Sequence, residues 1–516
     1  MTSMPSPVAT VQEGGPGSGA IAAGSRGTVR AGAAALAAGG NAVDGALAAL
    51  LAAPVGEPSL TSLGGGGFML VRQPDGHASM VDFFVDTPGL GSLPRRPASF
   101  IPVALQYPGT IQTFHVGAGS VGVPGCIPGL LESHAAFGRL PLEQVVAPAL
   151  EITRMGWPWE PMQIRVLQLV QRIFEASATG RQTAHRDDGS LVEPGDPTRM
   201  PGYDQTLEQL ADGTITSLSS PAIAEPLLRA MAVEGGLVTA EDLRRFRVFF
   251  RAPIALHRHG SDILTNPAPS FGGPIIVDAL TRTPRVDGSA DGWSQAAHSL
   301  IRATEYNRRV DQGSPAPRST QGTTHISVVD GDGMVVSLTT SNGSGSGMWI
   351  PGTGVHLNNM LGEEDLNPAG FHALPPGLRI GSMMSPTVVS REDGTVLAMG
   401  TGGSERIRSA LSEVLLRTVD LGLSAAESIG APRFHPVEGA VQVEPGWPDD
   451  VLAALGLELE VNVWARREVY FGGVHAVMRR PDGSVQAVGD PRRLGTTAVV
   501  TPAGEVIAAP EYTFDG

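Results

Sequence analysis

The segment Gly322-Thr323-Thr324-His325 joins a glycine to a pair of threonines at the start of a β-rich run. If the peptide bond before Thr323 were broken, the new chain would begin with threonine. Its hydroxyl and its freed α-amine would then belong to one residue, so the nucleophile would carry its own general base. This junction therefore predicts an N-terminal threonine nucleophile.

A hairpin is predicted directly after this junction, because the turn Asp330–Gly333 lies between two β-rich runs. Its expected pairing brings Thr323 opposite Thr340, within one residue, with Thr339 and Ser341 on either side. Hydroxyl groups would then surround the Thr323 oxygen and could orient it or relay its proton. Cross-strand threonine pairs also stabilise ordinary sheets, so the spacing alone leaves both interpretations open.

Two glycine-rich segments follow the hairpin, and they favour the catalytic interpretation. Asn342–Gly347 cannot be a regular strand interior, because glycine weakens strands and packs nothing. Gly400–Ser404 lies between a predicted strand and a helix predicted to begin near Arg406. Such a turn directs backbone N–H groups at one point, which would suit the oxyanion of acyl transfer.

Composition excludes several other mechanisms. The chain has 516 residues, and all 36 of its basic residues are arginine. A lysine Schiff base, a phosphate-loop lysine and a Ser-Lys dyad are therefore impossible. The single cysteine, Cys126, excludes internal disulfides and cysteine-rich zinc sites. A net charge of −15 without a basic run argues against nucleic-acid and anionic-membrane partners.

The N-terminal residues 1–18 are rich in Gly, Pro and Ser, and we expect them to be disordered. They lack a charged head followed by an apolar core, so no secretory signal is predicted. No apolar run reaches the length of a membrane span, and the alanine-rich stretch Ala31–Val55 fits a packed helix better. We expect a cytoplasmic protein.

Periodicity places helices in the first part of the chain and strands mainly after Thr323. Arg26–Leu51 is helical with a break at Gly39–Asn41, Leu63–Val71 is a glycine run leading into a strand, and residues 120–250 are mostly helical. A short helix is expected near Ser294–Arg309. The later strands are expected at His325–Val329, Met334–Thr340, Thr387–Ser390, Thr395–Met399, Val474–Met478 and Thr497–Thr501.

A metal site is conceivable only at His257-Arg258-His259, where two imidazoles share one strand face near Asp262. There is no third histidine in this segment, so an exposed edge strand is the favoured interpretation. No metal and no cofactor are expected.

These motifs together resemble the γ-glutamyltranspeptidase family of N-terminal-nucleophile hydrolases. The similar segments run nearly from end to end in the family's order. They are Gly39–Asp44, Leu63–Phe68, Val123–Gly125, Asn266-Pro267, Gly272-Gly273, Thr323–Asp330, Leu357–Asn359, Ser382–Thr387, Gly402–Ser404 and Ala431–Arg433.

The resemblance implies an α/β (α+β) fold, a four-layer αββα sandwich built by two fragments of one precursor. The precursor would cut itself between Gly322 and Thr323. The large fragment would comprise residues 19–322 after the disordered N-terminus, and the small fragment residues 323–516. The two would remain associated as a heterodimer and act on a small amide or peptide substrate.

The resemblance also implies roles for individual residues. Thr323 would attack an amide carbonyl, Ser341 would position it, and Gly402 and Gly403 would stabilise the oxyanion. Thr339 would assist autoprocessing. Water or an amine would then remove the acyl group.

The expected acyl pocket departs from the family pattern. Where the family has an arginine that grips the γ-glutamyl carboxylate, this chain has Phe84, and an apolar ring cannot make a bidentate clamp. The acidic or amide residue expected after Asn359 is Met360, and the second of two expected serines is Met383. The expected substrate-binding residues are Asn342, Asn359, Glu363, Ser382, Met383 and Phe84.

We therefore expect an autoprocessing amidase whose acyl group is not a standard γ-glutamyl. A more apolar acyl chain would fit, as would a small amide acid held by Arg379 or Arg406. Cephalosporin acylases and oxamate amidohydrolases of the family show such drift. Glutathione hydrolysis remains open if Glu363 and a rearranged arginine bind the substrate. The rival from another class is a catalytically idle relative that only binds ligands.

Overall fold

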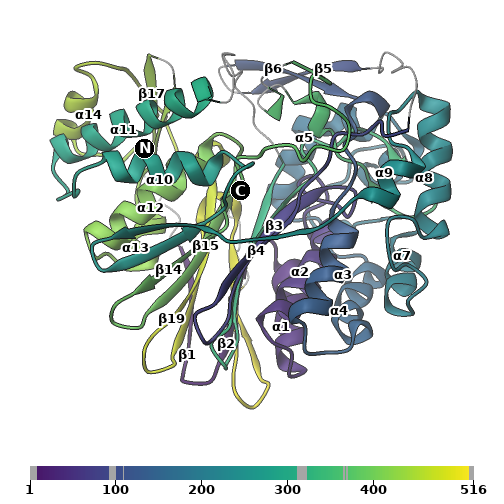
Figure 1. Cartoon of the computed structure of the whole chain (residues 1–516), viewed down its shortest axis with the longest axis horizontal. Helices are drawn as coiled ribbons and strands as arrows, with labels where there is room; N and C mark the ends of the chain where they lie inside the picture. Colours follow the sequence, from purple (N-terminus) through teal and green to yellow (C-terminus); the bar gives the residue numbers. More distant parts are fainter. Residues whose placement is uncertain are drawn as a thin grey trace.

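Two large antiparallel sheets face each other between layers of helices in the computed structural model (Figure 1). The structure describes residues 9–91, 100–107, 110–310, 322–363, 366–367, 370–437 and 439–510. This arrangement confirms the predicted α/β (α+β) class and the four-layer αββα sandwich.

The first sheet has eight strands and carries the Thr323 junction. In spatial order they are β22 (Val506–Ala508), β21 (Thr496–Val500), β2 (Gly19–Ala23), β10 (Thr324–Val329), β11 (Val335–Ser341), β3 (Gly66–Arg72), β4 (Ala78–Phe83) and β7 (Phe249–Arg251). Four of these strands precede Gly322 in the chain and four follow it. The two segments on either side of the junction therefore build one sheet together.

The second sheet has seven strands and lies across from the first. In spatial order they are β1 (Thr10–Gly14), β20 (Val485–Gly489), β19 (Gly473–Arg479), β15 (Val396–Gly402), β14 (Thr387–Arg391), β9 (Ser261–Thr265) and β8 (Ile254–Arg258). Short hairpins and a small three-stranded sheet complete the described strands: β5 (Ile101–Tyr107), β6 (Thr110–Val116), β12 (Trp349–Ile350), β13 (Val355–His356), β16 (Phe434–Val437), β17 (Ala440–Val443) and β18 (Glu460–Val463).

Helices cover the outer face of each sheet (Figure 1). On the side of the eight-stranded sheet lie α1 (Arg26–Ala37), α2 (Ala42–Gly56), α3 (Cys126–Phe137), α4 (Leu142–Met155), α5 (Pro161–Phe174), α6 (Ala178–Ala184), α7 (Tyr203–Ala211), α8 (Pro221–Glu234) and α9 (Ala240–Arg245). On the other side lie α10 (Gly272–Arg282), α11 (Ala290–Val310), α12 (Arg406–Leu415), α13 (Ala425–Gly430) and α14 (Asp449–Leu455).

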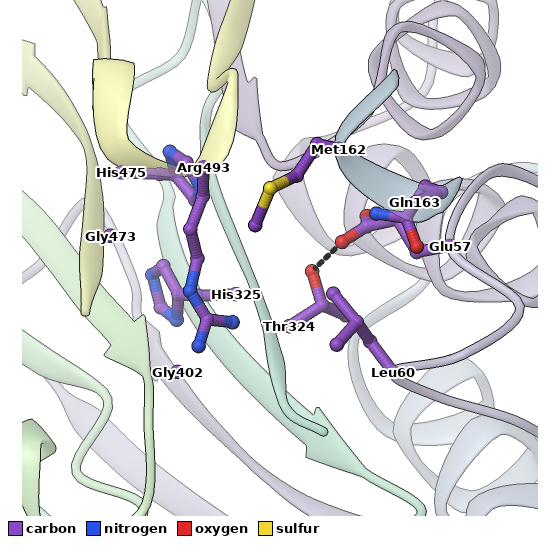
Figure 2. Close-up of a pocket in the computed structure, with 10 residues that line it drawn as sticks. All are labelled: Glu57, Leu60, Met162, Gln163, Thr324, His325, Gly402, Gly473, His475 and Arg493. Atoms are coloured by element: carbon purple, nitrogen blue, oxygen red, sulfur yellow. Dashed lines mark hydrogen bonds between the residues drawn. The ribbon is translucent and has the colours of Figure 1, made fainter. Parts of the chain in front are cut away.

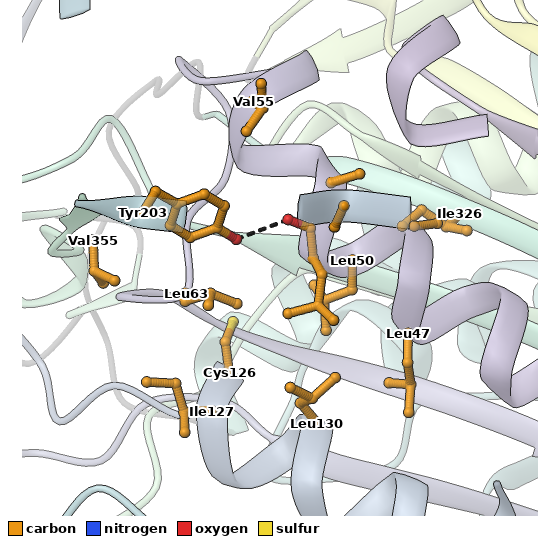
Figure 3. Close-up of a cluster of buried hydrophobic side chains, with 14 of the residues drawn as sticks. Leu47, Leu50, Val55, Leu63, Cys126, Ile127, Leu130, Tyr203, Ile326 and Val355 are labelled. Carbon is orange, nitrogen blue, oxygen red and sulfur yellow. Dashed lines mark hydrogen bonds between the residues drawn. The ribbon is translucent and has the colours of Figure 1, made fainter. Parts of the chain in front are cut away.

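Helix α2 is buried along its whole length and forms the centre of the first core (Figure 3). It begins where the sequence predicts, after the break at Gly39–Asn41. Asn41 caps its first N–H groups and Asp44 bonds back to the Asn41 N–H, so both ends of a capping box are present. The Tyr203 hydroxyl donates to Leu51 O at 2.8 Å, which satisfies the one polar atom of a buried ring.

Strand β2 shows how one sheet serves two cores. Ile21 and Ala23 pack in the cluster on the helix side, whereas Ala20 and Ala22 belong to the cluster between the sheets. Successive strand side chains point to opposite faces, so a strand buried on both sides is apolar at every position.

The prediction of a disordered N-terminus is wrong for the described part of residues 1–18. Thr10–Gly14 form β1 and pair with β20 along their full length. The alternation of half-buried and exposed side chains in this strand is typical of a sheet edge. Its short length between Gly- and Pro-rich flanks concealed it, and residues 1–8 lie outside the described part.

Most other element predictions agree with the structure. The six strands predicted from His325 onward are present within two or three residues of their expected ends. The helix near Ser294–Arg309 begins earlier, at Ala290. His257 lies on β8 at the edge of the second sheet and contacts Asp262 at 2.8 Å, as an edge strand allows. No helix among the described residues is long and apolar enough to cross a membrane.

Candidate active site

The hairpin of β10 and β11 sets the partner of Thr323. Thr324 pairs with Thr340, so the ladder continued by one residue brings Thr323 opposite Ser341. The sequence predicted Thr323 opposite Thr340 within one residue, and the structure lies within that margin, because Val329 pairs with Val335 and Met334 belongs to the turn. Ser341, whose hydroxyl was predicted to flank Thr323, therefore lies directly across from it.

Thr323 and Ser341 form a chain of hydroxyl hydrogen bonds that ends on the preceding carbonyl. Thr323 Oγ1 donates to Ser341 Oγ at 3.3 Å, and Ser341 Oγ donates to Gly322 O at 2.5 Å. The Gly343 N–H donates to Ser341 Oγ at 3.0 Å and fixes the serine in place. All of these groups are buried, with Thr323 only 1% exposed.

Gly322 occupies a position where no side chain fits. A Cβ on this residue would lie 2.5 Å from Gly343 O and 2.8 Å from Ser59 O. Both neighbours are backbone atoms, which cannot rotate away as a flexible side chain could. Glycine therefore lets the carbonyl of Gly322 approach the two hydroxyl groups.

An arginine side chain, and not a neighbouring strand, donates a hydrogen bond to the carbonyl of Thr323. Strand β2 pairs with β10 only from Ile326 onward, so it offers no ladder partner to Thr323 or Thr324. Arg493 Nη1 fills this position and donates to Thr323 O at 2.7 Å. Sequence reasoning missed this residue. The only local signal was the run Asp490-Pro491-Arg492-Arg493.

A buried charge network holds Arg493 in place. Its short 3-10 helix, Pro491–Arg493, begins at Asp490, whose carboxylate accepts hydrogen bonds from Arg433 and from the Val474 N–H. Burial alone would raise the pKa of Asp490, but the guanidinium groups of Arg433 and Arg492 lower it to about 2. Burial lowers the pKa of Arg493 to about 10, which still leaves it charged at neutral pH.

The glycine turn after β15 comes close to Thr323. A Cβ on Gly402 would lie 2.2 Å from Thr323 O, so this backbone contact is open only to glycine. Gly403 has a φ of 128°, in a region that favours glycine, and α12 begins three residues later at Arg406. The predicted strand, glycine turn and helix are therefore present beside Thr323.

A small pocket lies between Arg493 and Glu57, on the open side of β10 (Figure 2). Its volume is about 10 Å³, room for one water molecule. It is lined by Glu57, Leu60, Met162, Gln163, Thr324, His325, Gly402, Gly473, His475 and Arg493. The pocket thus places a carboxyl group and a guanidinium group on either side of the first strand residues after the junction.

Glu57 is the second residue that sequence reasoning missed. It follows α2, is 1% exposed, and accepts hydrogen bonds from Thr324 Oγ1 at 2.6 Å and from Thr28 Oγ1 at 3.1 Å. Burial raises the pKa of this carboxyl to about 7, although both hydrogen bonds act in the opposite direction. The signal in the sequence was one acidic residue at the end of a long apolar run.

His325 is held between hydroxyl groups inside the core and has a structural role. Its ring lies between Thr339 Oγ1 and Ser327 Oγ, each at 2.8 Å from a ring nitrogen. Burial lowers its pKa well below the ordinary value, so the imidazole is neutral. Thr339 lies two positions along β11 from Ser341, with its hydroxyl bonded to the His325 ring, and its part in autoprocessing stays a prediction.

The structure brings three predicted substrate-binding residues together just beyond Ser341. The Ser344 N–H donates to Asn359 Oδ1 at 2.8 Å and to Glu363 Oε1 at 3.3 Å. Asn342 O accepts from the Asn359 N–H at 3.4 Å. Gly343 is required between them, since a Cβ there would lie 2.1 Å from Asn359 Oδ1.

The other predicted substrate contacts are apolar or engaged elsewhere. Phe84 is buried and stacks on Phe68 with ring centroids 5.4 Å apart. Met360 and Met383 belong to the same buried cluster as Phe84. Ser382 Oγ accepts from the Met384 N–H at 3.1 Å.

Arg379 is not available as a substitute clamp, which corrects the expectation that it could hold a small acid. Its guanidinium bonds Asp82 at 2.5 Å and Asp86 at 2.6 Å. It also lies over the rings of Phe246 and Phe249, at 5.0 Å from each centroid. Arg406 lies over the Tyr470 ring at 4.8 Å.

Comparison with known proteins decides the family. The model of the gamma-glutamyltranspeptidase family matches residues 28–309 and 292–500, which together cover most of the chain. The chain belongs to the γ-glutamyltranspeptidase family. It is therefore an enzyme of the N-terminal-nucleophile hydrolase class, which includes hydrolases and transferases.

Relatives within the γ-glutamyltranspeptidase family include two kinds of proenzyme. The chain is 28% identical to the glutathione hydrolase proenzyme of Escherichia coli (strain K12), over 88% of this chain and 87% of the relative. It is 29% identical to the acylase ACY 1 proenzyme of Pseudomonas sp. (strain V22), over 93% of this chain and 94% of the relative. The cephalosporin acylase from Bacillus halodurans shares the fold, with a TM-score of 0.80, 24% identity and 99% coverage of both chains.

Proposed function

We propose that this γ-glutamyltranspeptidase-family protein is an autoprocessing amidase that cuts itself between Gly322 and Thr323 and then uses Thr323 as its nucleophile. The observation that carries the proposal is the hydroxyl chain from Thr323 through Ser341 to Gly322 O. The proenzyme names of the relatives support a processed precursor.

The first reaction is an acyl shift from nitrogen to oxygen within the chain. Thr323 Oγ1 attacks the carbonyl carbon of Gly322, and its proton passes along the hydrogen bond to Ser341. Ser341 polarises Gly322 O at the same time. The C–N bond then breaks, the threonine nitrogen takes up the proton, and water hydrolyses the resulting ester to a Gly322 carboxylate and a free Thr323.

The second reaction uses the new chain start on a substrate amide. The freed α-amine has a reference pKa of about 7.7–8.0 and can take the hydroxyl proton near neutral pH. Gly402 and Gly403 stabilise the oxyanion that forms when Thr323 attacks the carbonyl. The amine leaves, and water or a second amine releases the acyl group from the enzyme.

The acyl group that we propose is more apolar than γ-glutamyl. Phe84, Met360 and Met383 replace an arginine, an acidic or amide residue and a serine of the family pattern, and all three lie in one buried apolar cluster. A carboxylate buried there without a partner costs several kcal/mol, enough to prevent recognition. The acylase relatives support this choice.

One experiment tests the cleavage. The purified protein should give two fragments on a denaturing gel, and mass spectrometry should find residue 323 at the start of the smaller one. The Thr323→Ala variant should remain one chain. If that variant were cut as readily as the wild type, an external protease would be responsible and the proposal would fail.

A second experiment tests the substrate. Matured protein should release aniline chromophore faster from an anilide with an apolar acyl group than from γ-glutamyl anilide. Thr323→Ala serves as the blank in both assays. Efficient turnover of the γ-glutamyl compound would contradict the proposal that the acyl pocket is altered. If the cleaved protein turned over no amide at all, the alternative of a relative that binds ligands without catalysis would be favoured.

A further inference from the structure

Cleavage before Thr323 would turn this residue into a chain end and remove the restraint of the preceding backbone. The first residues of a chain fray unless other contacts hold them. On one side β10 pairs with β11 from Thr324, but on the other side β2 begins pairing only at Ile326. The new chain start would therefore have a strand neighbour on one side only.

Two side chains bind the residues at the start of β10, where β2 does not pair with it. Arg493 holds the carbonyl of Thr323 from the β21 side. Glu57 reaches Thr324 Oγ1 from the end of α2, on the opposite side of the pocket (Figure 2). Together they bind the backbone carbonyl of Thr323 and the side-chain hydroxyl of the next residue, Thr324.

The surroundings of Glu57 are built for this contact. Its other oxygen accepts from Thr28 on α1, so the carboxyl group is bound at two points and cannot swing away. A Cβ on Gly24 would lie 2.6 Å from Glu57 Oε2, so a glycine leaves room for the carboxyl group. Burying a carboxyl group costs folding free energy, and an ordinary sheet contact does not require such a group.

We propose that Glu57 is a positioning residue, which holds Thr324 and thereby keeps the Thr323 hydroxyl aligned after the chain has been cut. The inference rests on the proposed function, because it requires Thr323 to become a chain end. Before cleavage the backbone itself restrains Thr323. The contact with Glu57 therefore matters more for turnover than for maturation.

The test is a set of matched substitutions at Thr324. Thr324→Val removes the hydroxyl and keeps the shape, whereas Thr324→Ser keeps the hydroxyl. Thr340→Val is the control, because Thr340 is the direct ladder partner of Thr324, is equally buried, and donates to Gly66 O and not to Glu57. All three proteins are compared after maturation, with an amide substrate that the wild type turns over.

We expect Thr324→Val to lower kcat by about ten- to a hundred-fold with KM within about twofold, since a small misplacement of a reacting group has effects of this size. Thr324→Ser should restore most of the loss, and Thr340→Val should remain close to wild type. Equal losses in Thr324→Val and Thr340→Val, or a change confined to KM or to thermal stability, would overturn the inference.

A double-mutant cycle identifies the partner of Thr324. Glu57→Leu should lower kcat as much as Thr324→Val, and the double variant should lose no more than either single variant. Additive losses would show that the two residues act separately. If Glu57→Leu does not fold, the comparison of Thr324→Val with Thr324→Ser still decides the inference.

The outcomes separate this inference from the proposed function. Wild-type protein that stays whole at Gly322–Thr323 would defeat the proposed function itself. Wild-type protein that is cut and active, with Thr324→Val indistinguishable from Thr340→Val, would defeat only the role of Glu57.

Discussion

Arg493 Nη1 lies 2.7 Å from Thr323 O, although 170 residues separate the two in the chain. This hydrogen bond takes the place of a strand beside Thr323, because β2 pairs with β10 only from Ile326 onward. It comes from a buried guanidinium group on the short helix Pro491–Arg493, which begins at Asp490 and is held by the Asp490 network. The position of Thr323 therefore depends on residues far along the chain.

Replacing Arg493 should disturb both reactions. Arg493→Met leaves the carbonyl of Thr323 without a donor, and a hydrogen bond to a charged group contributes about 1.5–3 kcal/mol. We expect incomplete maturation on a denaturing gel and at least a ten-fold lower kcat in the matured fraction. Arg493→Lys keeps a donor and should lose less, and equal behaviour of the two variants would contradict the role of the hydrogen bond.

Ser341 should be needed for cleavage. Ser341→Ala removes both the acceptor for the Thr323 proton and the donor to Gly322 O, and general acid–base groups contribute about 10²–10⁴-fold. A time course of fragment appearance should slow by at least a hundred-fold. Ser341→Thr preserves the hydroxyl and is the control. Normal cleavage in Ser341→Ala would exclude the relay.

Gly322 should tolerate no side chain. Gly322→Ala places a Cβ 2.5 Å from Gly343 O, so the backbone must move and the carbonyl of residue 322 must leave Ser341. We expect loss of cleavage together with about 1–3 kcal/mol lower stability, as for other overpacked sites. Gly352→Ala is a control for a glycine with open space around its Cβ, although its φ of 78° adds some strain. Rapid cleavage of Gly322→Ala would contradict the tight approach.

The buried carboxyl of Glu57 predicts a pH dependence of stability. Its pKa rises from 4.5 to about 7 on folding, so the folded state binds the proton more tightly than the unfolded state. The stabilisation from the bound proton is complete below pH 4.5 and is lost as the pH rises through 7, by roughly 3 kcal/mol in all.

Glu57→Gln supplies the comparison for this pH dependence, because it keeps the shape and an acceptor oxygen without the charge. Both proteins carry Thr323→Ala so that the chains stay whole. The unfolding free energy of the Glu57 protein relative to the Glu57→Gln protein should fall between pH 4.5 and 7.5. A constant difference across that range would show that the Glu57 pKa is not raised.

Local patterns predicted much of the fold and part of the site. Nearby residues determine the conformation of three segments, so sequence reasoning located them. They are the break at Gly39–Asn41, the turn at Asp330–Gly333 and the glycine turn at Gly402-Gly403. The strand Thr10–Gly14 was missed because an edge strand of five residues has little periodicity of its own. This strand is formed by its hydrogen-bonded pairing with β20, which lies far away in the sequence.

The sequence by itself determined that Thr323 follows a glycine, precedes a hairpin and is accompanied by a hydroxyl on the partner strand. Only the tertiary structure decided the register that places Ser341 directly across from Thr323, since register depends on whether the turn has four residues or five. It also decided that Arg493 and Glu57 hold the peptide after the junction. These two contacts join residues that lie 170 and 267 positions apart in the chain, so no local sequence pattern indicates them. They form where β2 does not pair with β10, which leaves room for side chains from distant segments.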